Sequence, residues 1–230
     1  MFGAALLLSA PARAADPAEL ESKLTVTVDG VEKTLSLEEA KQALHIPSVS
    51  LALIDQDSIA FARAYGENAT PNTLYQAASL SKFVAAVGAM RLVEQKKLAL
   101  DGDVNAKLIS WKVPANGFDK SHPVTLRGLL SMTAGIGVPG FLGYAVDAPL
   151  PNLTQILYGV PPANSPPVTV ITQPGSAYAY GGSYEIAEAL MVDTAQAQFP
   201  DLMERLVLKP AGVSNSTFAQ PLPSSARARP

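Results

Sequence analysis

The segment Leu74–Phe83 reads LYQAASLSKF, and the spacing of its serine and lysine decides how the whole chain is interpreted. Ser79 precedes Lys82 by three residues, so in a helix the two side chains lie on the same face. A mostly apolar stretch follows, in which Arg91 is the only charged residue for more than two turns. We therefore predict a helix over residues 79–98 that is buried nearly all round.

Two interpretations of this pair are open from the residues alone. In the first, Ser79 is an ordinary helix cap and Lys82 faces water. In the second, Ser79 is a nucleophile and Lys82 is its base. The N-terminus of a helix favours negative charge, and both that position and burial disfavour a charged lysine, so a neutral amine could accept the serine's proton. Serine nucleophiles activated by lysine are a known variant of such pairs.

The composition of the 230 residues excludes several other kinds of chemistry. There is no cysteine, which rules out disulfides, zinc–thiolate sites and a cysteine nucleophile. Only two histidines are present, so a histidine metal cluster is not expected, and no G-x-S-x-G motif supports a Ser-His-Asp triad. The net charge is −3 and no basic run exists, which argues against nucleic acid as a partner. No apolar run is long enough to predict an integral membrane segment.

The first residues have the pattern of an export signal. An apolar run is followed by Ala12-Arg13-Ala14, a small-residue cleavage pattern, and then by polar sequence. We predict a signal peptide over residues 1–14 and a periplasmic or secreted protein. The alternative is an Ala- and Leu-rich helix start.

The rest of the chain places its expected strands before its expected helices. A few early strands without later partners would leave a sheet with an unpaired edge, through which the chain could self-associate. The expected strands are a hairpin over 23–35 and a pair at 48–54 and 59–66. A capped helix is expected over 36–44, short helices at 101–108 and after Thr125, a long loop over 138–175, and helices at 183–198 and 199–209.

Five segments, in order, resemble the serine β-lactamase-like and penicillin-binding superfamily, nearest its class C β-lactamase, D-alanyl-D-alanine carboxypeptidase and family VIII carboxylesterase branch. The resemblance implies an α+β fold, an α/β sandwich plus a helical region. The matching segments are IPSVSLALIDQDSIAFARAYG (46–66), YQAASLSKFVAAVGAMRLVEQKKLALDGDVNAKL (75–108), VTLRGLLSMTAGIG (124–137), PGSAYAYGGSYEIAEAL (174–190) and LVLKPAGVSNSTF (206–218).

The resemblance also implies roles for individual residues. Ser79 is the nucleophile, Lys82 its activating partner, and Tyr180 the tyrosine of the Y-x-N motif that assists proton transfer. Gly182 occupies the third, substrate-binding position of that motif, where asparagine is usual, and this departure weakens any claim of specific β-lactam hydrolysis. The implied substrate is an ester, a β-lactam or a peptidoglycan-like peptide, and neither a metal nor an organic cofactor is implied.

The larger departure is that nothing resembles the family's K/H-T/S-G strand, its neighbouring strands or its C-terminal helix. We therefore expect an incomplete domain over 15–230, with the early strands in 15–78 and a mainly helical part in 79–218. One hypothesis is an exported serine hydrolase that acts through an acyl-enzyme. A second is a non-catalytic remnant that binds or associates without turnover, and a third is a helical interaction protein with S-x-x-K by chance.

Overall fold

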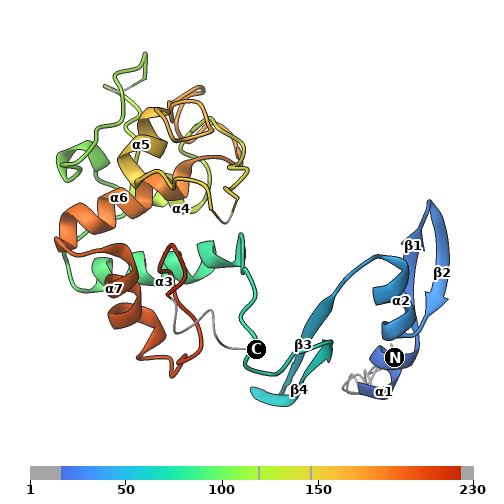
Figure 1. Ribbon diagram of the computed structural model, residues 1–230. Helices are drawn as coiled ribbons and strands as arrows, with labels where there is room; N and C mark the ends of the chain where they lie inside the picture. The colour runs from blue at the N-terminus through green and yellow to red at the C-terminus, as the bar shows by residue number, and fades with distance from the viewer. Residues whose placement is uncertain (1–16, 119, 146, 224–230) are drawn as a thin grey trace, which may run out of the picture. The chain divides into compact units, whose positions relative to one another are not determined.

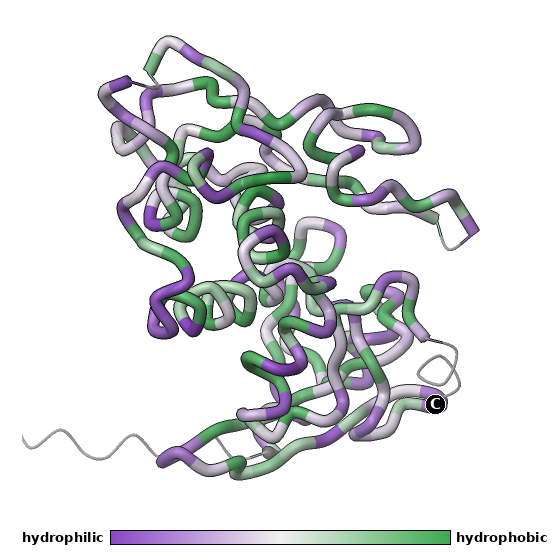
Figure 2. The backbone as a smooth tube through the Cα atoms, turned by 90° about the vertical axis from the view of Figure 1, so that its left-hand side faces the viewer, coloured by the Kyte–Doolittle hydropathy of each residue, from purple (hydrophilic) through white to green (hydrophobic). Residues whose placement is uncertain are grey.

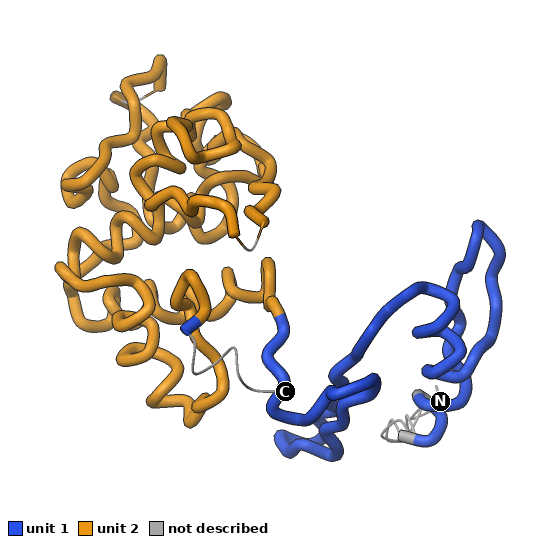
Figure 3. The backbone as a smooth tube through the Cα atoms, viewed as in Figure 1, with its two compact units in different colours: residues 1–75, 223–230 blue, residues 76–222 orange. Residues whose placement is uncertain are grey.

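The structure, a computed structural model, describes residues 17–118, 120–145 and 147–223, and they form two compact units. The first unit comprises residues 1–75 with 223–230, and the second comprises residues 76–222 (Figure 3). The chain passes from one unit to the other inside the segment LYQAASLSKF. The predicted signal peptide, residues 1–14, lies outside the described residues.

The first unit holds all the described strands, in two antiparallel pairs. The predicted hairpin is confirmed: Leu24 pairs with Leu35, and the turn places Asp29 and Gly30 at positive φ. The capping box at Ser36 is also present. The elements are α1 (Pro17–Ser22), β1 (Leu24–Val28), β2 (Val31–Leu35), α2 (Leu37–Ala43), β3 (Ser48–Asp55) and β4 (Ser58–Gly66) (Figure 1).

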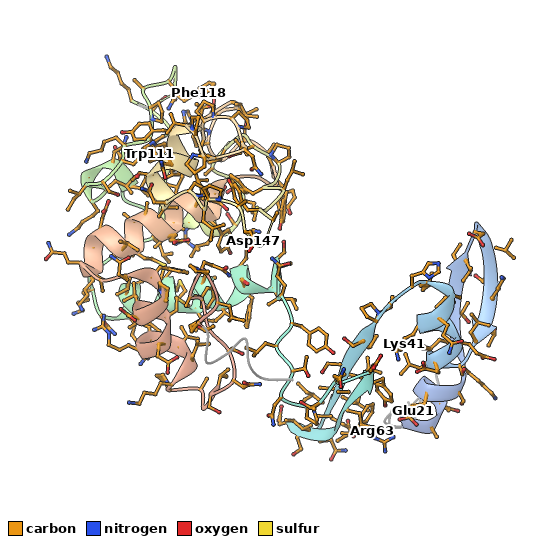
Figure 4. The ribbon with its side chains drawn as sticks, viewed as in Figure 1. Glu21, Lys41, Arg63, Trp111, Phe118 and Asp147 are labelled. Carbon is orange, nitrogen blue, oxygen red and sulfur yellow. The ribbon has the colours of Figure 1, made fainter. Side chains whose placement is uncertain are left out.

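Each sheet of this unit has only two strands, β1 with β2 and β3 with β4, and no named strand follows β4 in the part of the chain that the structure describes. The helix α1 is tied to β4 through Glu21, which forms an ion pair with Arg63 and accepts a hydrogen bond from the hydroxyl of Tyr65 (Figure 4). These bonds hold the pKa of Glu21 below its usual value, with Tyr65 as the largest cause and Arg63 next.

The second unit is helical, and α6 lies at its centre, in contact with α3, α4, α5 and α7. Apolar residues recur along its helices (Figure 2), and the core they form includes the fully buried Leu92, Leu126, Ile186 and Leu190, together with Trp111. The elements are α3 (Leu80–Glu94), the 3-10 turn η1 (Val104–Ala106), α4 (Leu126–Leu130), α5 (Leu153–Tyr158), α6 (Ser183–Ala195), α7 (Phe199–Met203) and the π-helical turn η2 (Glu204–Leu208).

The helix α3 differs from its prediction in length and in burial. It ends at Glu94 rather than near residue 98, because Lys96 takes a left-handed conformation that a helix cannot continue through. The expected burial all round was wrong: the side chains of Leu80 and Phe83 are 75% and 74% exposed. The buried residues of α3 are Gly88, Ala89 and Leu92, so its packing against α6, α7 and η2 does not cover Leu80 and Phe83.

Three smaller differences concern short helices. The predicted helix at 101–108 is only the 3-10 turn η1, and the helix predicted over 199–209 divides into α7 and η2. The expected long loop contains α5, whose capping box joins Asn152 and Gln155. No helix among the described residues is long and apolar enough to cross a membrane.

Candidate active site

Ser79 stands immediately before α3 and does not cap it. Its backbone is already helical, with φ −67° and ψ −13°, and its side chain makes no capping hydrogen bond. The preceding residue, Ala78, has φ +45°, a left-handed conformation that is costly for a residue with a Cβ. The cap interpretation of Ser79 was therefore wrong, and the tight turn leaves its hydroxyl free for other partners.

The structure brings Ser79, Lys82 and Tyr180 together. The hydroxyl oxygens of Ser79 and Tyr180, from residues 101 positions apart, lie 2.6 Å from each other. Lys82 donates to Ser79 Oγ at 3.4 Å, and its Nζ lies 5.0 Å from the centroid of the Tyr180 ring. The 2.6 Å separation is within the usual reach for proton transfer, and the 3.4 Å contact of Lys82 is slightly longer than that range.

The loop that carries Tyr180 is anchored to the segment 132–137 by backbone hydrogen bonds. The N–H of Ala179 donates to the carbonyl of Met132 at 2.8 Å, and that of Gly175 donates to the carbonyl of Thr133 at 2.7 Å. Since these bonds flank Tyr180 on its N-terminal side, they fix where the phenol enters the site.

The same segment depends on Gly135. This residue has φ +70°, and a Cβ built on it would lie 2.1 Å from the carbonyl oxygen of Thr172. Only glycine permits that approach of two backbones. The close contact joins the 132–137 segment to the start of the Tyr180 loop.

Gly182, next to this loop, is the N-cap of α6 and is buried. Its N–H donates to the carbonyl of Gly137 at 3.0 Å, and an added Cβ would lie 3.2 Å from both methyl groups of Val168. The packing explains why a glycine stands here. A contact between Gly182 and a substrate stays a prediction.

The neighbouring side chains lower the pKa of Tyr180. Interaction with Lys82 is the largest cause that lowers the pKa of the Tyr180 hydroxyl below its usual value, and the hydrogen bond with Ser79 lowers it further, against a smaller effect of burial. A phenol with a lowered pKa is a better proton acceptor near neutral pH. Lys82 itself is half-buried, so the burial expected from the sequence was overestimated.

The backbone N–H of Ser79 is also available to a ligand. It donates to no acceptor among the residues that the structure describes. Catalysis of acyl transfer uses such donors to stabilise the oxyanion that develops on a substrate carbonyl. Ser79 is exposed, so a substrate can reach both this N–H and the hydroxyl.

Two residues that the sequence analysis did not single out lie close by, Glu185 and Glu188 on α6. The Oε2 atom of Glu185 is buried without a hydrogen-bond partner in the described structure, and burial raises the pKa of Glu185. Burial, and then the neighbouring Glu185, raise the pKa of Glu188 to about 7. The available signal was two acids, three residues apart, in the otherwise apolar run EIAEALM (185–191). No group of three or more potential metal ligands occurs within the described ranges.

Comparison with known proteins identifies the fold. A β-lactamase/D-alanine carboxypeptidase from Yersinia pestis aligns at 19% identity with a TM-score of 0.64, over 80% of this chain and 52% of its own. The hydrolase EstCE1, described as having promiscuous acyltransferase activity, aligns at 24% identity with a TM-score of 0.59, over 75% and 49%. The α+β fold is therefore that of β-lactamases and DD-peptidases, and the chain spans about half of each structure.

Sequence comparison leads to the same group. Protein Rv1367c from Mycobacterium tuberculosis strain H37Rv is 26% identical over 162 residues, which are 64% of this chain and 39% of that protein. The Beta-lactamase family model matches residues 36–229, which include Ser79, Lys82 and Tyr180. The chain belongs to the Beta-lactamase family, a family of serine hydrolases.

Proposed function

We propose that this chain acts as a serine hydrolase through an acyl-enzyme, with Ser79 as its nucleophile. The observation that carries the proposal is the 2.6 Å separation between the hydroxyl oxygens of Ser79 and Tyr180, with Lys82 donating to the same serine. A serine between two such groups has a route for its proton when it attacks.

The proposed reaction has two stages, acylation of Ser79 and hydrolysis of the acyl-enzyme. Ser79 Oγ attacks the carbonyl carbon of an ester or amide and forms a tetrahedral intermediate. Its proton passes to the Tyr180–Lys82 pair and then to the leaving alcohol or amine, as the bond to that group breaks. Water attacks the resulting acyl-serine by the reverse path and releases a carboxylic acid. Proton transfer of this kind is worth roughly 10²–10⁴ in rate.

The substrate class we propose is a small ester, a β-lactam or a D-amino-acid amide of the peptidoglycan type. EstCE1 is described as a hydrolase and the Yersinia pestis protein as a β-lactamase/D-alanine carboxypeptidase, and both share the fold. The export pattern at residues 1–14 supports a periplasmic or secreted location, where peptidoglycan-like substrates occur.

The test is covalent labelling of the full chain with a fluorophosphonate probe and with a fluorescent penicillin. We expect labelling in the wild type and none in Ser79→Ala. Ser81→Ala is the matched control, because it removes a serine of the same segment that makes no hydrogen bond to Tyr180 or Lys82 in the described structure. No labelling of a folded wild type, or equal labelling of Ser79→Ala, would exclude the proposal.

A second candidate is a remnant that associates without turnover, and the exposed face of α3 favours it. Leu80, Phe83 and Met90 lie at helical spacing and are 75%, 74% and 43% exposed. The two-stranded sheets have edges that no other described strand pairs with, and these edges offer another surface for self-association. This candidate predicts concentration-dependent oligomers in sedimentation that Phe83→Ser reduces. A monomer with esterase turnover would exclude it.

A further inference from the structure

A pocket of about 240 Å³ lies beside Lys82 in the helical unit, and Ser79 is not among the residues that line it. It is partly enclosed and mainly apolar. Its walls come from the start of α3, from α6, from α7 and from the segment that follows η2; the residues used below are Lys82, Glu185, Glu188, Phe199 and Phe218. No part of the proposed acyl transfer needs this space.

The unusual feature of the pocket is a pair of largely buried glutamates, one of which has an unsatisfied carboxyl oxygen. Glu185 and Glu188 are three residues apart on α6, so they lie on the same face, and both line the pocket. Glu185 Oε2 is buried without a hydrogen bond, and neither side chain forms an ion pair within the described residues. A buried, unpaired carboxylate is costly, and a donor that entered the pocket would remove that cost.

Lys82 does not supply that donor in this structure. Its Nζ is turned to Ser79 and to the Tyr180 ring, and no salt bridge joins it to either glutamate. Burial raises the pKa of both glutamates, and a bound cation would favour their ionised forms. When both are ionised, the pocket holds two carboxylates beside a single lysine. A cation is therefore the complementary ligand.

The aromatic part of the pocket wall indicates what the uncharged end of the ligand should be. Phe199 and Phe218 meet edge to face, with ring centroids 5.3 Å apart, and both line the pocket. Aromatic rings bind apolar groups and also attract cations. The unsatisfied Oε2 of Glu185 requires a hydrogen-bond donor, which a primary ammonium has and a quaternary ammonium lacks.

We propose that this pocket is a binding site for a primary organic ammonium, with its charged head at Glu185 and Glu188 and an apolar body against Phe199 and Phe218. The site shares Lys82 with the proposed acyl transfer, and Glu185 acts electrostatically on Tyr180, but binding of the ammonium does not require the Ser79 hydroxyl. A ligand of the size of 2-phenylethylammonium is small enough for the available volume.

The experiment measures binding of 2-phenylethylammonium to the full chain by calorimetry, next to two ligands of similar shape. We expect 2-phenylethanol and the trimethylated quaternary ammonium to bind about tenfold or more weakly, since charge-assisted hydrogen bonds are lost. Glu185→Gln and Glu188→Gln should weaken ammonium binding similarly. Glu204→Gln, at an exposed position outside the pocket, should not.

The ligand comparison uses the wild type alone, so it stays decisive where a variant folds poorly. Ser79→Ala should bind the ammonium as the wild type does, which separates this site from the proposed hydrolase activity. Equal binding of the alcohol and the ammonium, or full ammonium binding in both glutamine variants, would overturn the proposal.

Discussion

The hydroxyl of Tyr180 lies 2.6 Å from the hydroxyl oxygen of Ser79, across a separation of 101 residues. Lys82 donates to the same serine oxygen at 3.4 Å, which is a longer bond. Because the shorter contact belongs to the tyrosine, we propose that Tyr180 accepts the serine's proton and that Lys82 assists by lowering the pKa of the Tyr180 hydroxyl.

The first prediction concerns the Tyr180 hydroxyl. Tyr180→Phe should slow acylation of Ser79 by a fluorophosphonate by roughly 10²–10⁴, the range typical of general-base assistance. Tyr178→Phe is the matched control, because Tyr178 is 67% exposed on the same loop and makes no hydrogen bond to the Ser79 hydroxyl in the described structure. Equal labelling rates in both variants would contradict the assigned role.

The second prediction concerns the pH dependence of that step. A base must be deprotonated to accept a proton, so acylation should rise with pH and level off above the pKa of Tyr180. Since Lys82 and Ser79 lower that pKa from 10.0, half of the rise should occur below pH 10. The pKa of Tyr180 can be measured by a pH titration of tyrosinate absorbance. The signal of Tyr180 is the difference between the titration of the wild type and that of Tyr180→Phe.

The Lys82 contribution can be separated in the same titration. Lys82→Met should move the pKa of Tyr180 upward, because Lys82 is the largest cause of its lowering. Arg91→Met removes a cation of the same helix that pairs with Glu94 instead, and it should leave the titration unchanged. An unchanged titration in Lys82→Met would show that the lysine does not control the tyrosine.

The third prediction concerns stability and Glu188. Its pKa is raised from 4.5 to about 7 in the folded chain, so between these values the folded state holds a proton that the unfolded state has lost. The free energy of unfolding should therefore fall by about 3 kcal/mol from this group as pH rises from about 4.5 to about 7. Above pH 7 it should change little.

Urea unfolding of the wild type and of Glu188→Gln from pH 5 to pH 8 tests whether the free energy of unfolding falls as pH rises. The variant should lose most of that pH dependence and be the more stable of the two at pH 8. Glu204→Gln, at an exposed position, should keep the wild-type slope. A wild type that gains stability relative to Glu188→Gln as pH rises would show the opposite linkage.

The fourth prediction concerns the support of the Tyr180 loop. Gly135→Ala places a Cβ against the carbonyl of Thr172 at a residue with φ +70°, and should destabilise the chain by roughly 1–3 kcal/mol. It should also slow Ser79 labelling, because the loop anchored on 132–137 shifts. Gly140→Ala meets nothing within 4 Å and should leave both measurements unchanged.

The sequence alone determined the local elements of the chain. The turn at Asp29 and Gly30 and the caps at Ser36 and Thr125 are set by residues a few positions apart, and the structure has all of them. The S-x-x-K spacing likewise placed Ser79 and Lys82 on one side of the start of α3, because a helix brings such residues together whatever surrounds it. The ordered motifs indicated the Beta-lactamase family.

Only the tertiary structure decided what depends on packing between distant segments. It showed that α3 is covered on one face, so Leu80 and Phe83 are exposed although their sequence is apolar. It brought Tyr180 to Ser79 through backbone bonds to the 132–137 segment, a pairing that no local spacing encodes. It also enclosed Glu185 and Glu188 in a pocket, because burial of a carboxyl group is a property of the neighbours that surround it.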